Sequence, residues 1–256
     1  MKEYLKMTRS GTYGFIMAIP LFLGYEICMM ITENQGVAIS SAILFQKLLY
    51  MMGLSGPSLY IGLAVLLIVS GAVIIFNERK DNIKLKPKYF GLMMLESLIY
   101  LPVFIFVVGT LTKQITAKLS AMAPLADGSG GADIWSKIGL SLGAGVYEEL
   151  VFRVILIGGI FVISNWVLVS LLDFEEKKGF FNSKVIAWFI AANIGSLIFS
   201  YVHYIGSLGD DFTVVSFIFR YIAGLVLFAL YRLRGFGIAA WTHAIYDIAV
   251  LVFMTN

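Results

Sequence analysis

Long hydrophobic stretches, separated by short polar segments, recur along the whole chain. A helix needs roughly 20 mainly apolar residues to cross the hydrocarbon core of a membrane. Seven stretches meet this requirement: six cover about residues 11–31, 57–76, 90–111, 146–170, 184–205 and 212–231, and the seventh follows residue 237. Within them the apolar residues are nearly continuous and do not alternate with polar ones, which favours helices over the strands of a β-barrel. The pattern predicts an all-α, polytopic membrane protein with about seven transmembrane helices.

Two further segments have apolar character but do not fit a simple span. Residues 38–53 are short and contain Gln46 and Lys47, so we expect an interfacial or re-entrant helix there. Residues 135–172 would form a helix of roughly 57 Å, too long to cross a core of about 30 Å in a straight line.

The glycines at positions 143 and 145 predict a break in that long helix. The break would separate an amphipathic segment, residues 135–144, from the span that begins at residue 146. Glycines 158, 159, 195 and 224 are expected to be points of close packing between helices.

The distribution of lysine and arginine predicts the orientation. Thirteen of these residues lie in the N-terminal segment, the loops 77–89 and 173–184 and the turn 232–234, whereas four lie in the segments of the opposite side. Cytoplasmic loops carry an excess of these residues. We therefore expect a cytoplasmic N-terminus and a C-terminus on the other side.

Composition agrees with a membrane protein and excludes several other classes. Hydrophobic residues make up 59% of the 256 residues and charged residues 14%, against about 25% charged in soluble domains. The formal charge of +3 is too small to indicate a nucleic-acid partner, and the single cysteine, Cys28, excludes an intrachain disulfide and a multi-cysteine metal site. No internal repeat is present, so we expect a single integral membrane domain over residues 1–256.

Three ionisable residues, Glu148, Glu149 and Arg153, lie within an otherwise apolar stretch. Such residues are costly in a membrane and indicate a functional site by default. Residues at positions i and i+4 share a helical face, so Glu149 is expected to pair with Arg153, which leaves Glu148 to meet another group. The alternative is that all three residues form one buried charge network that holds the helices together.

The only two histidines, His203 and His243, also lie in apolar helices. His243 is four residues before Asp247, so a carboxylate can orient its imidazole through the second ring nitrogen. Two histidines and two acids on three helices are difficult to explain as independent packing choices. Together they could carry out general acid–base chemistry.

The three motifs are similar to those of a known family. Glu148–Arg153 fits the pattern EExxxR, Phe199–His203 fits FxxxH, and His243–Asp247 fits a pattern of the HxxxN type. In this order they resemble the CPBP family of intramembrane proteases, which includes the type II CAAX prenyl endopeptidases and bacterial Abi or bacteriocin self-immunity proteins. The resemblance covers about residues 135–250, which makes residues 135–256 the expected catalytic core and residues 1–134 the N-terminal spans.

The resemblance implies a role for each matching residue. Glu148 would activate a water with help from His203, while His243 and Asp247 would stabilise the oxyanion of the tetrahedral intermediate. The structural support would come from Glu149, Arg153 and Phe199. The last position is commonly asparagine in the family, and an ionised Asp247 cannot donate a hydrogen bond. Asp247 therefore either stays protonated or orients His243.

The resemblance favours chemistry without a metal or another cofactor. Zinc is the alternative, with Glu148, His203 and His243 as three ligands and a water as the fourth. A zinc-binding HExxH pair on one helix is absent from the sequence.

The leading hypothesis is an endopeptidase of the bacterial inner membrane, with the N-terminus in the cytoplasm. It would cleave near the membrane-anchored C-terminus of a membrane-anchored or lipidated protein. The main alternative is a non-catalytic immunity or helper protein that binds a partner through the same polar cluster. A proton-coupled or ion transporter would be favoured if Glu26, Glu96 and Arg220 lined an aqueous path, but these three residues are expected to serve packing.

Overall fold

The computed structural model describes residues 2–32, 47, 49–51, 53–55, 57–117, 133–172, 182–205 and 209–254. Within these residues every regular element is a helix, and seven helices are long and apolar enough to cross a membrane. The prediction of an all-α, polytopic membrane protein with about seven spans is therefore confirmed. These helices are Gly11–Ile31, Ile61–Asp81, Pro87–Thr116, Ile134–Ser170, Ser183–Val202, Val214–Arg234 and Phe236–Phe253.

The chain forms two compact units. The first contains Met1–Leu101, Ser129–Glu148 and Leu230–Asn256, and the second contains Pro102–Gly128 and Glu149–Ala229. Each unit has its own packing and is described by itself. The single integral membrane domain stays a prediction.

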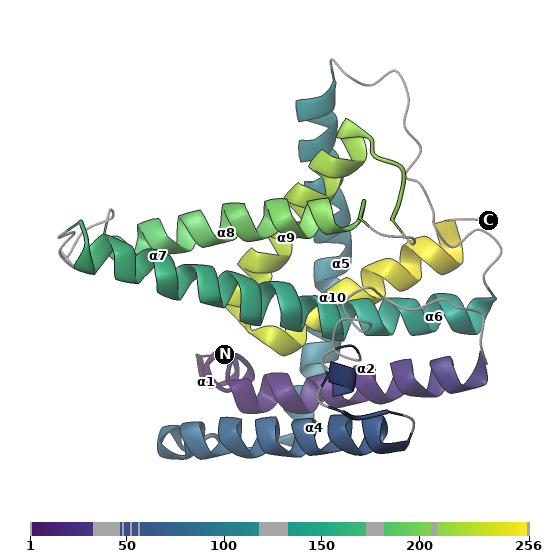
Figure 1. Cartoon of the computed structure of the whole chain (residues 1–256), viewed down its shortest axis with the longest axis vertical. Helices are drawn as coiled ribbons and strands as arrows, with labels where there is room; N and C mark the ends of the chain where they lie inside the picture. Colours follow the sequence, from purple (N-terminus) through teal and green to yellow (C-terminus); the bar gives the residue numbers. More distant parts are fainter. Residues whose placement is uncertain are drawn as a thin grey trace. The chain divides into compact units, whose positions relative to one another are not determined.

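The first unit is built around three helices that pack against one another. They are α2 (Gly11–Ile31), α6 (Ile134–Gly143) and α10 (Phe236–Ile248), and α4 (Pro57–Glu78) packs on the other side of α2 (Figure 1). Their buried core includes Leu21, Tyr25, Val146, Ala240 and Ala244.

The short N-terminal helix α1 (Lys2–Thr8) and the first half of α5 (Pro87–Thr116) add a second core to this unit. It contains Met7, Tyr13, Met17, Tyr89, Met93 and Ile238. The indole of Trp241 also donates a hydrogen bond of 2.8 Å to the carbonyl of Met17, which joins α10 to α2.

The second unit contains α7 (Gly158–Ser170), α8 (Ser183–Val202) and most of α9 (Val214–Arg234). Helices α7 and α8 pack along their length (Figure 1), with the rings of Phe161 and Trp188 stacked at 3.9 Å. Helix α9 contacts α8 through a hydrogen bond of 2.7 Å from the hydroxyl of Ser200 to the carbonyl of Phe217.

The predicted break at Gly143 and Gly145 is wrong. The backbone stays helical from Ile134 to Ser170, and Ala144–Ile157 is a π-helix that joins α6 to α7. Gly145 serves close packing instead, because a Cβ atom there would lie 2.5 Å from the carbonyl oxygen of Ala240.

The other glycines of the spans divide into two groups. A Cβ atom at Gly195 would lie 2.3 Å from a side-chain carbon of Ile157, and one at Gly224 would lie 3.0 Å from the Cβ of Ser196, which confirms close packing at both. At Gly158 and Gly159 an added Cβ atom would meet no atom of the described residues within 4 Å, so the same prediction is wrong there.

Polar side chains stabilise several helix starts. The carboxylate of Asp133 accepts hydrogen bonds from the amides of Trp135 and Ser136 at the start of α6. The carboxylate of Glu78, at the end of α4, accepts from the amides of Gly11 and Thr12 and so caps α2. Both satisfy amide groups that a helix leaves without an internal partner.

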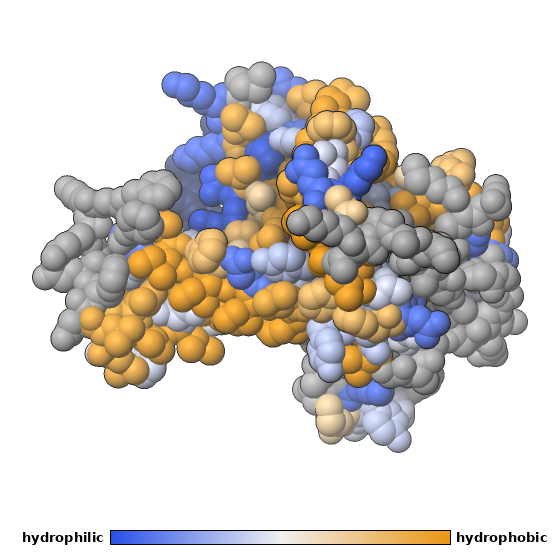
Figure 2. Space-filling view, turned by 90° about the horizontal axis from the view of Figure 1, so that it is seen from above, coloured by the Kyte–Doolittle hydropathy of each residue, from blue (hydrophilic) through white to orange (hydrophobic). Residues whose placement is uncertain are grey.

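Large apolar side chains remain exposed over much of the surface, as expected for helices that face lipid (Figure 2). The helices α4 and α5 contribute many of them, including Ile61, Ile68, Phe76, Leu95 and Phe106. Most of the segment 38–53 lies outside the described residues. Within the polar stretch 112–134, residues 118–132 also lie outside them.

Candidate functional site

The first unit brings together three of the four predicted catalytic residues. His243 of α10 is buried, with 7% of its side chain exposed, and its Nε2 lies 4.0 Å from Oε2 of Glu148. The same Nε2 lies 3.5 Å from Oδ2 of Asp247, four residues further along α10. Two carboxylates therefore face one imidazole nitrogen.

Close packing between the π-helix and α10 accounts for this approach. Gly145, three residues before Glu148, lies against Ala240 and Ala244, which precede and follow His243 on α10. Ala240 and Ala244 are fully buried. Small residues on both helices let the two backbones come close, which carries Glu148 to the imidazole.

The arrangement differs in one respect from the expected one. We expected Asp247 to engage the second ring nitrogen of His243, but both carboxylates lie nearest Nε2. An Nε2–H group has one proton to donate, so Glu148 and Asp247 compete for it. Both separations exceed the usual hydrogen-bond length.

Carboxylate and imidazole groups are side chains that can take part in general acid–base chemistry. The side chain of Glu148 is 13% exposed, so it is mostly buried but still partly accessible. A carboxylate in such a position can accept a proton from water, and a protonated imidazole beside it can donate a hydrogen bond to a developing oxyanion.

The second unit holds the predicted supporting residues. The ion pair between Glu149 and Arg153 is present at 3.1 Å, with 0% and 1% of the two side chains exposed. The guanidinium of Arg153 lies 4.3 Å from the centre of the Phe199 ring, and this ring contacts the imidazole of His203 edge to face at 4.9 Å. Phe199 thus packs against both Arg153 and His203.

The local hydrogen bond of His203 determines which ring nitrogen carries the proton. Its Nδ1 lies 2.7 Å from the carbonyl oxygen of Phe199, four residues earlier on α8. A carbonyl oxygen can only accept, so Nδ1 is the protonated nitrogen in this contact. In the neutral ring Nε2 then carries the lone pair, which is the form that accepts a proton or positions a water.

The chain after His203 is held by a group of contacts that sequence reasoning did not anticipate. The amide of Asp210 donates to the carbonyl of His203 at 2.9 Å, and its carboxylate pairs with Arg220 on α9. Arg220 also donates to the hydroxyl of Ser216, which accepts a hydrogen bond from Tyr204. The signal in the sequence was an acidic turn ten residues before an intramembrane arginine.

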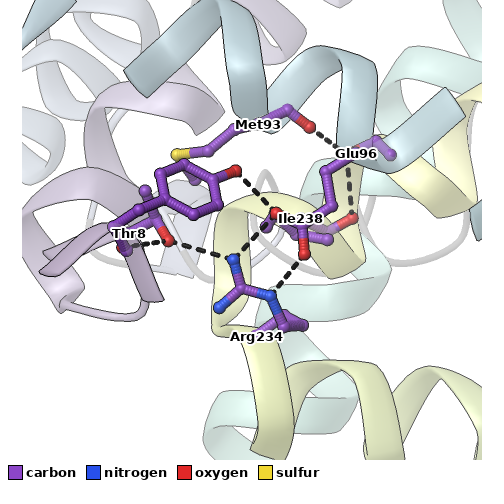
Figure 3. Close-up of polar contacts among 7 residues, drawn as sticks. Thr8, Met93, Glu96, Arg234 and Ile238 are labelled. Carbon is purple, nitrogen blue, oxygen red and sulfur yellow. Dashed lines mark hydrogen bonds and ion pairs between the residues drawn. The ribbon is translucent and has the colours of Figure 1, made fainter. Parts of the chain in front are cut away.

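The remaining acids of the spans have partners of their own. The hydroxyl of Tyr147 donates to Glu26 at 3.2 Å. Glu96 pairs with Arg234, as Figure 3 shows. Glu96 also accepts a hydrogen bond of 2.6 Å from Tyr4. Arg234 additionally donates to the hydroxyl of Thr8, which joins α1, α5 and the end of α9. These contacts agree with a packing role for Glu26 and Glu96.

The zinc alternative depends on three side chains that do not all belong to one unit. Across the described residues, no group of three or more histidine, cysteine, aspartate or glutamate side chains is close enough to hold a metal ion. Of the predicted zinc ligands, Glu148 and His243 belong to the first unit and His203 to the second. The zinc set therefore stays a prediction.

Comparisons with known proteins identify a family. The family model described as type II CAAX prenyl endopeptidase, Rce1-like, matches residues 130–249. No curated protein and no solved structure matches the chain. The matched segment includes every predicted site residue, from Glu148 to Asp247. Residues 130–249 thus match the Rce1-like family of type II CAAX prenyl endopeptidases, in agreement with the family that the three motifs indicated.

Proposed function

We propose that the chain is an intramembrane endopeptidase that hydrolyses a peptide bond near the membrane-anchored C-terminus of another protein. The observation that carries this proposal is the approach of Glu148 to His243, at 4.0 Å, inside the segment that matches a CAAX endopeptidase family. The substrate would be a membrane-anchored or lipidated protein, and the enzyme would reside in a bacterial inner membrane with its N-terminus in the cytoplasm.

In the first step of the proposed reaction, Glu148 accepts a proton from a water molecule. At the same time, the oxygen of this water attacks the carbonyl carbon of the substrate. The carbonyl oxygen becomes an oxyanion, and the Nε2–H of His243 donates a hydrogen bond to it. Glu148 then passes its proton to the departing amine, so the carbon–nitrogen bond breaks and leaves an acid and an amine.

Asp247 and His203 would assist at different points. The Asp247 carboxylate lies 3.5 Å from the same Nε2. When Asp247 is ionised, it would stabilise the protonated imidazole of His243. This favours the orienting role of Asp247 over the role of a protonated donor. His203 would position the water through its Nε2, an assignment that rests on the family motif and on the hydrogen bond from Nδ1 to Phe199.

The decisive experiment compares membrane proteins from cells that express wild type or Glu148→Gln. The amide keeps the shape of the side chain but cannot accept the proton, so we expect cleavage to fall by roughly 10²- to 10⁴-fold. The readout is the C-terminal processing of membrane proteins by mass spectrometry. Glu26→Gln is a matched control, because it alters another intramembrane acid. The amide oxygen of the new side chain can still accept the hydrogen bond from Tyr147.

Unchanged processing with Glu148→Gln would contradict the protease and favour a protein that binds its partner without cleaving it. A chelator titration of the wild-type activity tests the metal question separately. Activity that survives chelation supports chemistry without a metal, whereas a loss that zinc restores would favour Glu148, His203 and His243 as ligands.

A further inference from the structure

The second unit contains a network of contacts that the three motifs do not include. It surrounds the end of α8, where His203 follows the last helical residue. Its members come from the segment between α8 and α9 and from the first two turns of α9. We call this group the α8 clasp, and it consists of Tyr204, Asp210, Ser216 and Arg220.

His203 occupies a position that a helix by itself holds weakly. The last four carbonyl groups of a helix have no partner inside the helix, and helix ends open more readily than helix centres. His203 directly follows Val202, the last residue of α8. A histidine there keeps one orientation only if contacts from outside the helix hold the last turn.

The segment before α9 supplies the first of these contacts. The amide of Asp210 donates a hydrogen bond of 2.9 Å to the carbonyl of His203. Gly209 lies against the backbone of Tyr204, so that a Cβ atom at Gly209 would be 2.8 Å from the carbonyl carbon of Tyr204. Residues 209 and 210 therefore pack directly on the end of α8, and the amide of Asp210 satisfies a carbonyl that the helix leaves open.

The side chains of the clasp hold this segment in place. The carboxylate of Asp210 pairs with the guanidinium of Arg220, and only 17% of each side chain is exposed. The hydroxyl of Ser216 accepts hydrogen bonds of 2.9 Å from Nη1 of Arg220 and from the hydroxyl of Tyr204. The guanidinium also lies 5.1 Å from the centre of the Tyr204 ring. Arg220 thus contacts both the residue that follows His203 and the residue that is bonded to its carbonyl.

The direction of the His203 imidazole depends on the same turn. Its Nδ1 donates to the carbonyl oxygen of Phe199 at 2.7 Å, across one turn of α8. This bond can form only while residues 199–203 keep their helical spacing. Because the bond determines which ring nitrogen carries the proton, a loosened turn would let the imidazole exchange between its two neutral forms and would redirect its Nε2.

The alternative is that the ion pair of the clasp only holds α8 against α9. A largely buried arginine in a membrane helix needs a counter-charge wherever it lies, so the pairing alone does not separate the two roles. The position of the clasp favours a role in orienting His203, because the amide of Asp210 is bonded to His203 itself.

We propose that Arg220 and Asp210 are positioning residues for His203. Their ion pair holds the last turn of α8 and thereby keeps the imidazole in the form that carries its proton on Nδ1. This inference rests on the proposed function, in which His203 positions the attacking water through Nε2. It adds two residues that act on the reaction through His203 alone.

The first experiment observes the imidazole directly. The purified full chain carries isotopically labelled histidine and is studied by NMR in detergent micelles at about pH 8, where an imidazole is ordinarily neutral. The chain has only two histidines, so a spectrum of His203→Ala assigns the signals of both. In the wild type we expect separate signals from a protonated Nδ1 and an unprotonated Nε2 of His203.

The variant Asp210→Ala removes the carboxylate but keeps the backbone amide that bonds to His203. The two nitrogen signals of His203 should then move towards each other, because the imidazole exchanges between its neutral forms. Should this variant fail to fold, Arg220→Lys keeps the charge but lacks the planar fork that serves Asp210 and Ser216 together. It should move the signals in the same direction by a smaller amount.

The matched control is Asp211→Ala. Asp211 is the next residue in the same segment, is exposed, and forms no ion pair among the residues that the structure describes. The control removes the same charge and should leave the histidine signals as they are in wild type. Unchanged signals in Asp210→Ala, or equal movement in Asp210→Ala and Asp211→Ala, would overturn the proposal.

The second experiment measures turnover of a membrane protein whose processing is lost with Glu148→Gln. Asp210→Ala should lower kcat by roughly ten- to a hundredfold with little change in KM, since a misplacement of about 1 Å can cause such a loss. In a His203→Ala background the same substitution should cause no further loss, because the clasp acts through His203. A loss of equal size in both backgrounds would show a purely structural role and would also overturn the proposal.

The two experiments separate this inference from the proposed function. If Glu148→Gln leaves processing unchanged, the protease proposal fails, and the NMR comparison still decides whether the clasp orients His203. If Glu148→Gln abolishes processing and the histidine signals do not respond to Asp210→Ala, the positioning proposal alone fails.

Discussion

Glu148 and Glu149 are neighbours in the chain but have different surroundings. Glu149 is fully buried and pairs with Arg153 on the next turn, whereas Glu148 is partly exposed and lies near His243. A buried charge without a counter-charge is costly, so the role of Glu149 is to balance the charge of Arg153. The two carboxylates can therefore be tested separately, one by turnover and the other by stability.

We expect Glu149→Gln to lower the free energy of unfolding by about 3–5 kcal/mol, because it removes the carboxylate charge that faces the buried guanidinium of Arg153. Chemical or thermal unfolding in micelles measures the loss. The double variant Glu149→Leu/Arg153→Met removes both charges and should recover most of the stability. A loss below about 1 kcal/mol for the single variant would show that the pair contributes little.

At the scale of elements, the π-helix Ala144–Ile157 is the segment that carries Glu148. Its first turn contains Gly145, where an added Cβ atom would lie 2.5 Å from Ala240 O and 2.7 Å from Ala244 Cβ. π-Helical turns are uncommon and occur frequently at functional sites. The close contact at Gly145 thus helps to set the position of Glu148 relative to α10.

Gly145→Ala should therefore destabilise the protein by about 1–3 kcal/mol through overpacking. It should also reduce turnover, by up to about a hundredfold if the helices separate by about 1 Å. Gly159→Ala is the control on the same continuous helix, since its Cβ atom would meet no atom of the described residues within 4 Å. The control should keep full activity with unchanged or slightly higher stability. Equal behaviour of the two variants would contradict a packing role for Gly145.

The start of α6 gives a pH-dependent prediction. The hydroxyl of Ser136, followed by the amides of Ser136 and Trp135, holds the pKa of Asp133 below its ordinary value of 3.8. A lowered pKa in the folded state means that the ionised cap stabilises the fold above the unfolded-state pKa and that this contribution is lost as pH falls through the folded-state pKa.

Asp133→Ala should consequently lower the melting temperature at pH 6, and the difference from wild type should shrink as the pH approaches 3. Thermal unfolding of the two proteins across this pH range, in the same detergent, measures it. A difference that stays constant down to pH 3 would show that ionisation of Asp133 does not contribute to the cap.

At the scale of the whole molecule, the surface combines apolar sides with charged helix ends. Exposed leucine, isoleucine, valine and phenylalanine side chains cover the sides of the spans, while Lys2, Lys6, Arg9 and the cations of residues 79–88 lie near the ends of α1, α4 and α5. Such a surface is stable only where lipid replaces water along the sides. Because cytoplasmic loops carry an excess of lysine and arginine, we expect the cationic ends to face the cytoplasm.

Reporter fusions test the resulting orientation. A phosphatase that is active only after export should be inactive when fused after Leu85, in the basic loop, and active when fused after Asn256. This follows from seven spans with a cytoplasmic N-terminus. Activity at both positions, or only at Leu85, would contradict the predicted topology.

The local part of the site could be predicted without a structure. Seven spans follow from hydropathy because a membrane requires each helix to be apolar over its own length. The ion pair of Glu149 with Arg153 and the shared face of His243 and Asp247 follow from helical spacing, because residues four apart are neighbours on any helix. The three motifs also indicated the family before any contact between helices was known.

The contacts between distant residues required the tertiary structure. Glu148 and His243 are 95 positions apart, and neither hydropathy nor helical spacing states that their helices meet at Gly145. The same limit explains the wrong break at Gly143 and Gly145, because a glycine that weakens a helix and one that admits a neighbouring helix are identical in the sequence. The contacts of Arg234 with Thr8 and Glu96 likewise exist only because α1, α5 and the end of α9 meet.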